Sequence, residues 1–129
     1  MAIHESGENF LESILVLGAG QKDVHSVEVA RRLGVSKPTV TKGVKILMQE
    51  GYVVMDGVHL RLTPRGEERA RAVYEKHTVI TEFWTRLGVP PAAAERDACR
   101  MEHIVGDEVF AVMKEFVLRA RAADAERKE

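Results

Sequence analysis

The sequence is short of cysteine, of aromatic residues and of long apolar runs, and each shortage excludes a class of protein. One Cys in 129 residues cannot form a disulfide within the chain, which predicts a reducing, cytoplasmic compartment. An aromatic content of 5% argues against a surface that stacks on the bases of single-stranded nucleic acid. No apolar run approaches about 18 residues, so the sequence predicts no membrane span.

The chain also lacks a strong net charge, but its charges are unevenly distributed. The formal net charge is −1. Residues 25–72 nevertheless hold nine basic side chains against five acidic ones, an excess of four. The nine are Arg31, Arg32, Lys37, Lys42, Lys45, Arg61, Arg65, Arg69 and Arg71. A basic section within a near-neutral chain indicates a local face for a polyanion.

Two short predicted helices within this basic section indicate a helix-turn-helix. The first covers Ser26–Leu33, with Ser26 as its expected cap, and ends at Gly34. The second starts with Ser36 as the cap and Pro38 in the first turn, and it runs to about residue 50. Its expected inward positions are Val40, Val44, Leu47 and Met48. The residues expected to reach the major groove are Ser36, Lys37, Pro38, Thr39, Thr41 and Lys42.

A small hairpin is predicted directly after these two helices. Residues 52–55 and 59–62 are β-like runs on either side of Asp56-Gly57, a favoured hairpin turn. A helix-turn-helix followed by such a hairpin is a winged helix. Arg61 on the second strand is then placed to contact the DNA backbone.

The remaining predicted elements are helices, so we expect a mainly α fold. They cover Asn9 to about Leu17, Thr63 to about Leu87, the run from Pro91 to about Val105, and Asp107 to about Ala122. We expect a winged helix-turn-helix domain over residues 1–72 and a helical domain over residues 73–129, linked by the long helix from about 64. The last helix is expected to bury Val109, Val112, Met113, Phe116 and Val117. Helices this apolar predict a homodimer.

Three metal-ligand side chains share one face of the predicted helix after Pro91. Cys99, Glu102 and His103 stand at i, i+3 and i+4. Taken alone, this spacing also fits a buried inert thiol beside a solvated Glu–His pair. Asn9 and Glu12 allow a similar pair of interpretations, as ligands or as a helix cap and a surface residue.

The chain resembles the diphtheria toxin repressor family of metal-dependent transcriptional regulators, and within it the short manganese transport regulators. The resemblance covers nearly the whole chain. It rests on Asn9 to Glu12, Ser36 to Thr41, Leu62 to Gly66, His77, Cys99 to His103, and Asp107 to Val109. It implies a two-domain repressor of metal homeostasis genes that binds double-stranded DNA at a palindromic operator as a homodimer.

The resemblance also implies the metal ligands. They are Asn9, Glu12, His77, Cys99, Glu102 and His103. Cys99, Glu102 and His103 correspond to the core of a primary site, and Glu12 and His77 to an adjacent one. Because the first helix belongs to the DNA-binding domain, the bound metal would clamp one domain to the other.

Two departures from the family pattern bear on the choice of metal. Manganese regulators carry a carboxylate at the Cys99 position, whereas iron regulators carry Cys there, and Asn9 matches neither group. A thiolate is softer than a carboxylate and shifts preference away from Mn²⁺. The expected metal is therefore Fe²⁺ or Mn²⁺, with a lean to Fe²⁺ and with Co²⁺, Ni²⁺ and Zn²⁺ as further candidates.

Two other functions compete with this hypothesis. Asn9 motivates a winged-helix regulator whose metal site is vestigial, and which is constitutive or senses a small molecule. A hydrolase or metalloenzyme that uses Cys99, Glu102 and His103 is a weaker alternative, because the sequence offers no evident oxyanion donors beside them. We therefore expect a regulator and not an enzyme.

Overall fold

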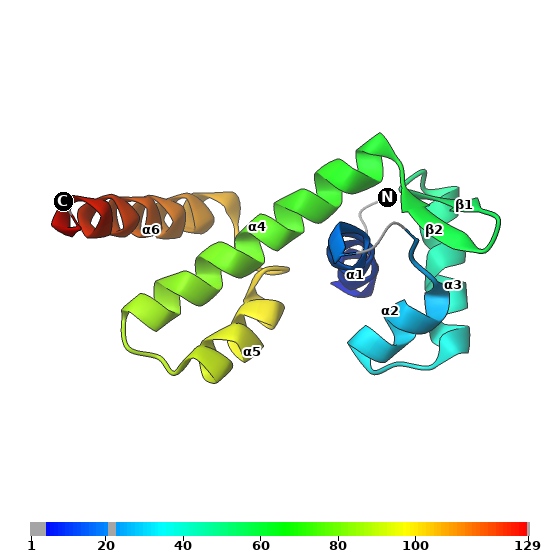
Figure 1. Cartoon of the computed structure of the whole chain (residues 1–129), viewed down its shortest axis with the longest axis horizontal. Coiled ribbons are helices and arrows are strands. Elements are labelled where there is room, and N and C mark those ends of the chain that lie inside the picture. Colours follow the sequence, from blue (N-terminus) through cyan, green and yellow to red (C-terminus); the bar gives the residue numbers. More distant parts are fainter. Residues whose placement is uncertain (1–4, 21–22, 129) are drawn as a thin grey trace. The chain divides into compact units, whose positions relative to one another are not determined.

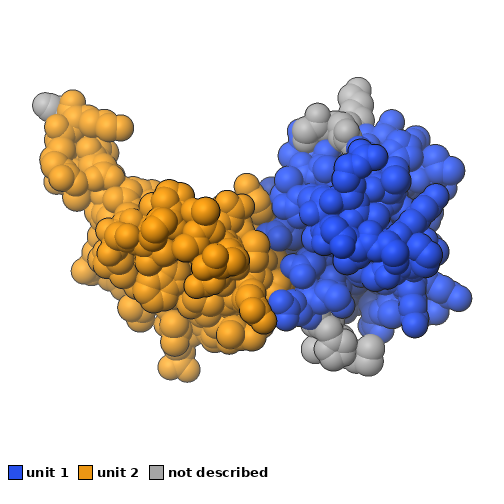
Figure 2. All heavy atoms as spheres, turned by 90° about the horizontal axis from the view of Figure 1, so that it is seen from below, with its two compact units in different colours: residues 1–72 blue, residues 73–129 orange. Residues whose placement is uncertain are grey.

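The computed structural model describes residues 5–20 and 23–128. The chain divides into two compact units, unit 1 (Met1–Ala72) and unit 2 (Val73–Glu129), which Figure 2 colours separately. The described elements are α1 (Glu5–Gly20), α2 (Ser26–Leu33), α3 (Lys37–Gln49), β1 (Val53–Asp56), β2 (His59–Leu62), α4 (Pro64–Arg86), α5 (Pro91–Met101) and α6 (Asp107–Arg127) (Figure 1). The predicted mainly helical class with a small wing is confirmed. None of the helices in the described ranges is long and apolar enough to cross a membrane.

The core of unit 1 lies where α1, α2 and α3 meet. Leu11, Val29 and Val40 are fully buried there. Helix α3 approaches α1 at Gly43, where a Cβ atom would lie 2.0 Å from the Phe10 ring. Glycine at this position therefore allows the close approach of α3 to the Phe10 ring.

The helix-turn-helix forms as the sequence predicts, with two corrections. Gly34 adopts a left-handed conformation (φ 68°) after α2, and Ser36 caps α3 by accepting a hydrogen bond from Thr39 N at 3.3 Å. The cap of α2 is His25 and not Ser26, because the backbone N–H of His25 donates to Glu28. Met48 is 42% exposed and not inward, since it lies one position beyond the buried Leu47 on the helix surface.

The wing is an antiparallel hairpin that is fastened to the rest of unit 1 by its backbone. Strands β1 and β2 pair from Val53↔Leu62 to Asp56↔His59. The turn between them uses Gly57 with φ 66°. Leu60 N donates to Val24 O at 2.8 Å, so the segment before α2 holds the wing in place.

Helix α1 is longer at its start than the sequence predicted. It begins at Glu5, so Asn9 lies inside the helix and cannot be its cap. The Arg69 guanidinium at the base of α4 donates twice to the Glu8 carboxylate, at 2.8 and 3.0 Å. This pair ties α1 to the part of α4 that belongs to unit 1.

Unit 2 packs α5 and α6 on the C-terminal part of α4. Its core contains Val79, Ile80, Ala98, Met113 and Val117. The small side chain of Ala98 is fully buried, which lets α5 lie close to α4.

Both helices of unit 2 that follow α4 differ from their predicted bounds. Helix α5 ends at Met101 and not near Val105, because the N–H groups of Ile104 and Val105 both bond to Met101 O in a tight turn. β-branched residues followed by Gly106 are poor helix formers, which fits this early end. Helix α6 continues past Ala122 to Arg127.

The predicted core face of α6 is only partly buried. Met113 and Val117 are buried as predicted, but Val109, Val112 and Phe116 are 58, 66 and 40% exposed. The prediction failed for these three because apolar residues occupy more than one side of α6, and only one side meets α4 and α5. The exposed set is called the α6 face below.

Candidate metal centre and nucleic-acid interface

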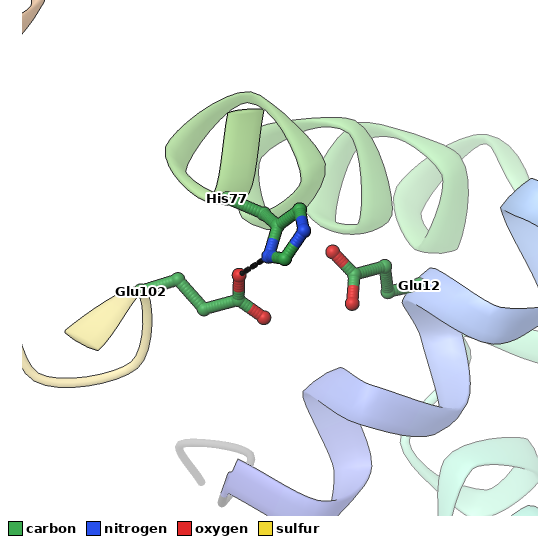
Figure 3. Close-up of side chains that lie close together, drawn as sticks. All are labelled: Glu12, His77 and Glu102. Atoms are coloured by element: carbon green, nitrogen blue, oxygen red, sulfur yellow. Dashed lines mark hydrogen bonds and ion pairs between the residues drawn. The ribbon is translucent and has the colours of Figure 1, made fainter. Parts of the chain in front are cut away.

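Four predicted metal ligands lie together within unit 2. The Nδ1 atom of His77, on α4, is 2.9 Å from Oε2 of Glu102, which follows the end of α5 (Figure 3). The same Nδ1 atom is 3.7 Å from the Cys99 thiol on α5. His103 Nε2 lies 3.4 Å from the other oxygen of Glu102, Oε1. Two imidazoles, a thiol and a carboxylate thus converge on one another.

The spacing of Cys99, Glu102 and His103 predicts one face of a continuous helix, and the backbone follows this pattern as far as Glu102. Helix α5 ends at Met101, but Glu102 keeps helical dihedrals (φ −59°, ψ −22°) and its N–H donates to Ala98 O at 2.9 Å. The backbone tightens only at His103, whose N–H donates to Arg100 O at 3.4 Å. The side chains meet because His77 on α4 lies opposite the turn over residues 102–104.

The Glu102 carboxylate is buried beside two imidazoles. Its side chain is 0% exposed, and Oε1 has no hydrogen-bond partner among the described residues. It pairs with the imidazoles of His77 and His103, whose side chains are 17 and 3% exposed. A buried carboxylate is costly unless a cation or several hydrogen bonds compensate it. The donors present fit a divalent transition metal.

The other predicted ligands lie on α1, in unit 1. Glu12, also labelled in Figure 3, is a buried charged residue, and Asn9 is half-buried one turn before it. Their assignment as ligands stays a prediction. On α4, Thr81 donates its hydroxyl to His77 O at 2.7 Å.

The residues predicted to contact DNA form an exposed polar surface at the start of α3. All six are exposed, namely Ser36, Lys37, Pro38, Thr39, Thr41 and Lys42. Val40, Val44 and Leu47 are buried on the opposite side of the helix, so the polar side is turned outward. Arg61 on the wing is 46% exposed and pairs with Asp56 at 2.8 Å. The use of these residues in binding DNA stays a prediction.

One residue beside the metal centre was not singled out from the sequence. Lys76 donates its ammonium to Val105 O at 3.3 Å, immediately after the turn that carries Glu102 and His103. A backbone carbonyl acceptor leaves no signature in the sequence, so no motif could have identified this contact.

Comparisons with known protein families match both parts of the chain. The model described as "Iron dependent repressor, N-terminal DNA binding domain" matches residues 2–58. The model described as "Iron dependent repressor, metal binding and dimerisation domain" matches residues 63–123. The second match includes His77 and the segment from Cys99 to His103.

Curated proteins of similar sequence are transcriptional regulators. The transcriptional regulator MntR of Salmonella typhimurium is 42% identical over 103 residues, which cover 78% of this chain and 63% of that protein. The diphtheria toxin repressor of Corynebacterium diphtheriae is 32% identical, over 81% of this chain and 47% of that protein. An HTH-type transcriptional regulator of Methanocaldococcus jannaschii is 31% identical and is covered to 93%. The chain thus spans less than two thirds of the first two proteins.

Solved structures of manganese regulators share the fold. The structure of the manganese regulator SloR matches with a TM-score of 0.78 and 27% identity, over 91% of this chain and 54% of that one. A manganese-dependent transcriptional repressor in complex with manganese matches with a TM-score of 0.79 and 26% identity, over 86% of this chain and 52% of that one.

Proposed function

This chain belongs to the iron-dependent repressor family, and we propose that it is a transcriptional repressor whose DNA binding is switched on by Fe²⁺ or Mn²⁺. The observation that carries the proposal is the buried Glu102 carboxylate, which is met by two imidazoles and has an oxygen without a hydrogen-bond partner among the described residues. Such a group stays ionised at low cost when a metal cation binds it.

The two units divide the work in this proposal. Unit 1 is the DNA-binding domain, which presents the start of α3 to the major groove and Arg61 to the backbone. Unit 2 is the metal-binding and dimerisation domain. The likeness of both segments to the family models supports this division.

The ligand set proposed for the metal joins the two units. His77, Cys99, Glu102 and His103 provide nitrogen, sulfur and oxygen donors from unit 2, and Asn9 and Glu12 add oxygen donors from α1. A bound divalent cation supplies positive charge and a fixed coordination geometry. Ligation by α1 then favours the arrangement of unit 1 that fits DNA. Such coupling is typically about 1–3 kcal/mol and is reciprocal, so operator DNA must tighten metal binding by the same factor.

The donor set leans toward Fe²⁺. Cys99 provides a soft thiolate, and Asn9 provides a neutral amide oxygen in place of a charged carboxylate. The thiolate disfavours Mn²⁺, which prefers hard oxygen ligands, and the loss of a charge at Asn9 weakens the site for any divalent metal. The similar solved structures are of manganese regulators, whereas the donors of this chain favour Fe²⁺.

A second copy of this chain is the proposed partner of the α6 face. Val109, Val112 and Phe116 are exposed on one side of α6, in the segment that matches a dimerisation domain. Two-fold pairing through this face would set the spacing of two recognition helices on a palindromic operator. The cytoplasmic location expected from the sequence follows from a role on chromosomal DNA.

The alternative functions differ in what they predict for metal. A constitutive or small-molecule-sensing regulator with a vestigial site does not explain the buried Glu102 carboxylate. An enzyme is disfavoured because the family is one of repressors.

The test is DNA binding by the full chain with and without metal. Binding to its own promoter region is measured by fluorescence anisotropy under reducing conditions, with Fe²⁺, with Mn²⁺ and with chelator. We expect either metal to tighten binding by about 5–150-fold, the range of typical allosteric coupling. Equal affinity in chelator rejects the proposal in favour of a constitutive regulator.

Two variants locate the effect in the metal centre. His103→Ala should lose the metal response while keeping its weak metal-free DNA binding and its fold. Glu75→Gln, which removes an exposed carboxylate that pairs with Lys114 on α6, is the matched control and should respond fully. A full metal response by His103→Ala would show that the ligand assignment is wrong.

A further inference from the structure

The turn that carries Glu102 and His103 is held at both ends by side chains of α4. At its start, the indole N–H of Trp84 donates to the Met101 sulfur at 3.3 Å. At its end, the Lys76 ammonium donates to Val105 O at 3.3 Å. Positions 76, 80 and 84 are spaced by four residues and share one side of α4. Helix α4 therefore contributes His77 and also contacts the residue before the turn and the residue after it.

The second contact continues toward α6. The Lys76 ammonium is 3.9 Å from the carboxylate of Asp107, the first residue of α6, and 5.8 Å from the centre of the Phe110 ring. The Lys76 side chain is only 24% exposed, whereas Asp107 is fully exposed. An exposed ion pair of this length contributes little. The bond to the Val105 carbonyl is therefore the contact that matters.

We propose that Lys76 is a positioning residue for the metal centre, which holds the end of the 102–104 turn so that Glu102 meets both His77 and His103. This inference rests on the proposed metal-binding function. The turn is held within itself by bonds from Ile104 N and Val105 N to Met101 O. These bonds lie within the turn, whereas the bond from Lys76 to Val105 O joins the end of the turn to α4.

The direction in which metal affinity changes when Lys76 is replaced distinguishes a positioning role from a purely electrostatic one. A lysine near a cation site repels the cation, so loss of its charge alone would tighten metal binding. Loss of a positioning contact would weaken it, because the ligands then lose their preset geometry. Removal of groups that orient metal ligands typically costs about 10–100-fold in affinity.

The test compares Lys76→Met with the wild-type full chain, and Co²⁺ is the probe. Met keeps most of the apolar stem and removes the donor. We expect Co²⁺ affinity to fall about tenfold, and the visible absorption bands of the bound Co²⁺ to change because the ligand geometry changes. Lys76→Arg, which keeps a cationic donor of similar reach, should restore most of the affinity and the wild-type spectrum.

Lys114→Met is the matched control. It removes a lysine that also links α4 to α6, through Glu75 at 3.2 Å, but that does not touch the turn. We expect it to bind Co²⁺ like the wild type. Metal-free melting temperatures should be similar for both Met variants, which shows that a general loss of stability is not the cause.

The outcomes distinguish this inference from the proposed function. If the wild type binds Co²⁺ and Lys76→Met binds equally or more tightly, Lys76 does not position the turn. The same holds if Lys114→Met is weakened as much. If the wild type itself binds no metal, the proposed function fails first. Should Lys76→Met not fold, Lys76→Gln, which keeps a shorter uncharged donor, takes its place with the same expected direction.

Discussion

Helices α3 and α6 are both surface helices, but they turn opposite chemistry toward solvent. The first half of α3 exposes short polar and cationic side chains and buries Val40 and Val44. Helix α6 exposes Val109, Val112 and Phe116 while it buries Met113 and Val117. Polar donors and lysines suit a phosphate backbone, whereas a row of apolar side chains suits another protein surface. The two helices therefore indicate two different partners for one chain.

The largest expected effect tests the apolar side of this comparison. Val112→Glu places a charge in the middle of the α6 face, where a second copy would have to bury it. We expect the dimer to dissociate, as measured by analytical ultracentrifugation. DNA affinity should then fall by at least about a hundredfold, because the two half-sites are no longer bound by one linked molecule.

Leu118→Glu is the control for this variant. Leu118 is 49% exposed on the same helix, but it projects from another side of α6. It should leave the dimer intact. A dimeric Val112→Glu, or a monomeric Leu118→Glu, would move the interface away from the α6 face.

The polar side of the comparison is tested by Lys42→Ala on α3. Lys42 is exposed beside the capped start of the helix, so its loss removes one phosphate or guanine contact without disturbing the core. We expect DNA binding to weaken, with the salt dependence of log K falling by about one unit of slope for one phosphate contact. Metal affinity and the dimer should be unchanged. Lys128→Ala, at the far end of α6, should change none of these quantities.

The start of α3 could be predicted from the sequence, whereas the exposed side of α6 could not, and the reason is physical. The start of α3 follows from local signals, because Ser36 and Pro38 define a helix start wherever they stand. The exposed side of α6 does not, because periodicity reports that a residue is apolar but not which neighbour covers it. A helix face that binds a second copy has the same apolar periodicity as a face that packs in the core.

The geometry of the predicted metal centre was predictable only in part. Helical spacing relates Cys99 to Glu102 correctly, because Glu102 keeps helical dihedrals, but His103 follows where the turn tightens. His77 could be joined to them only through the family resemblance, since 22 residues separate it from Cys99. The early end of α5 was missed because no Gly or Pro interrupts the run before Gly106, and backbone bonds in the turn decide it.

The smallest expected effect concerns the hydrogen bonds that hold α6 on α4, on the side of α6 away from the exposed α6 face. Arg121 on α6 donates to Glu82 on α4 at 3.0 Å through Nε, and Arg86 donates to the same carboxylate at 2.8 Å. The hydrogen bond from Arg121, with that from Arg86, holds the pKa of Glu82 below its ordinary value of 4.5. A lowered folded-state pKa means that the ionised form stabilises the fold.

Glu82→Gln should therefore lower the free energy of unfolding by about 1 kcal/mol at pH 7, since the carboxylate is partly exposed and screened by solvent. The contribution is fully present above the unfolded pKa and is lost as the pH falls through the lowered folded one. Thermal melts of the metal-free protein at pH 7 and near pH 3 measure it, and the difference between variant and wild type should shrink in acid. Equal melting at pH 7 would mean that the bonds to Glu82 do not help to hold α6 on α4. The apolar contacts of Met113 and Val117 and the other charged pairs, such as Lys114–Glu75, would then be sufficient.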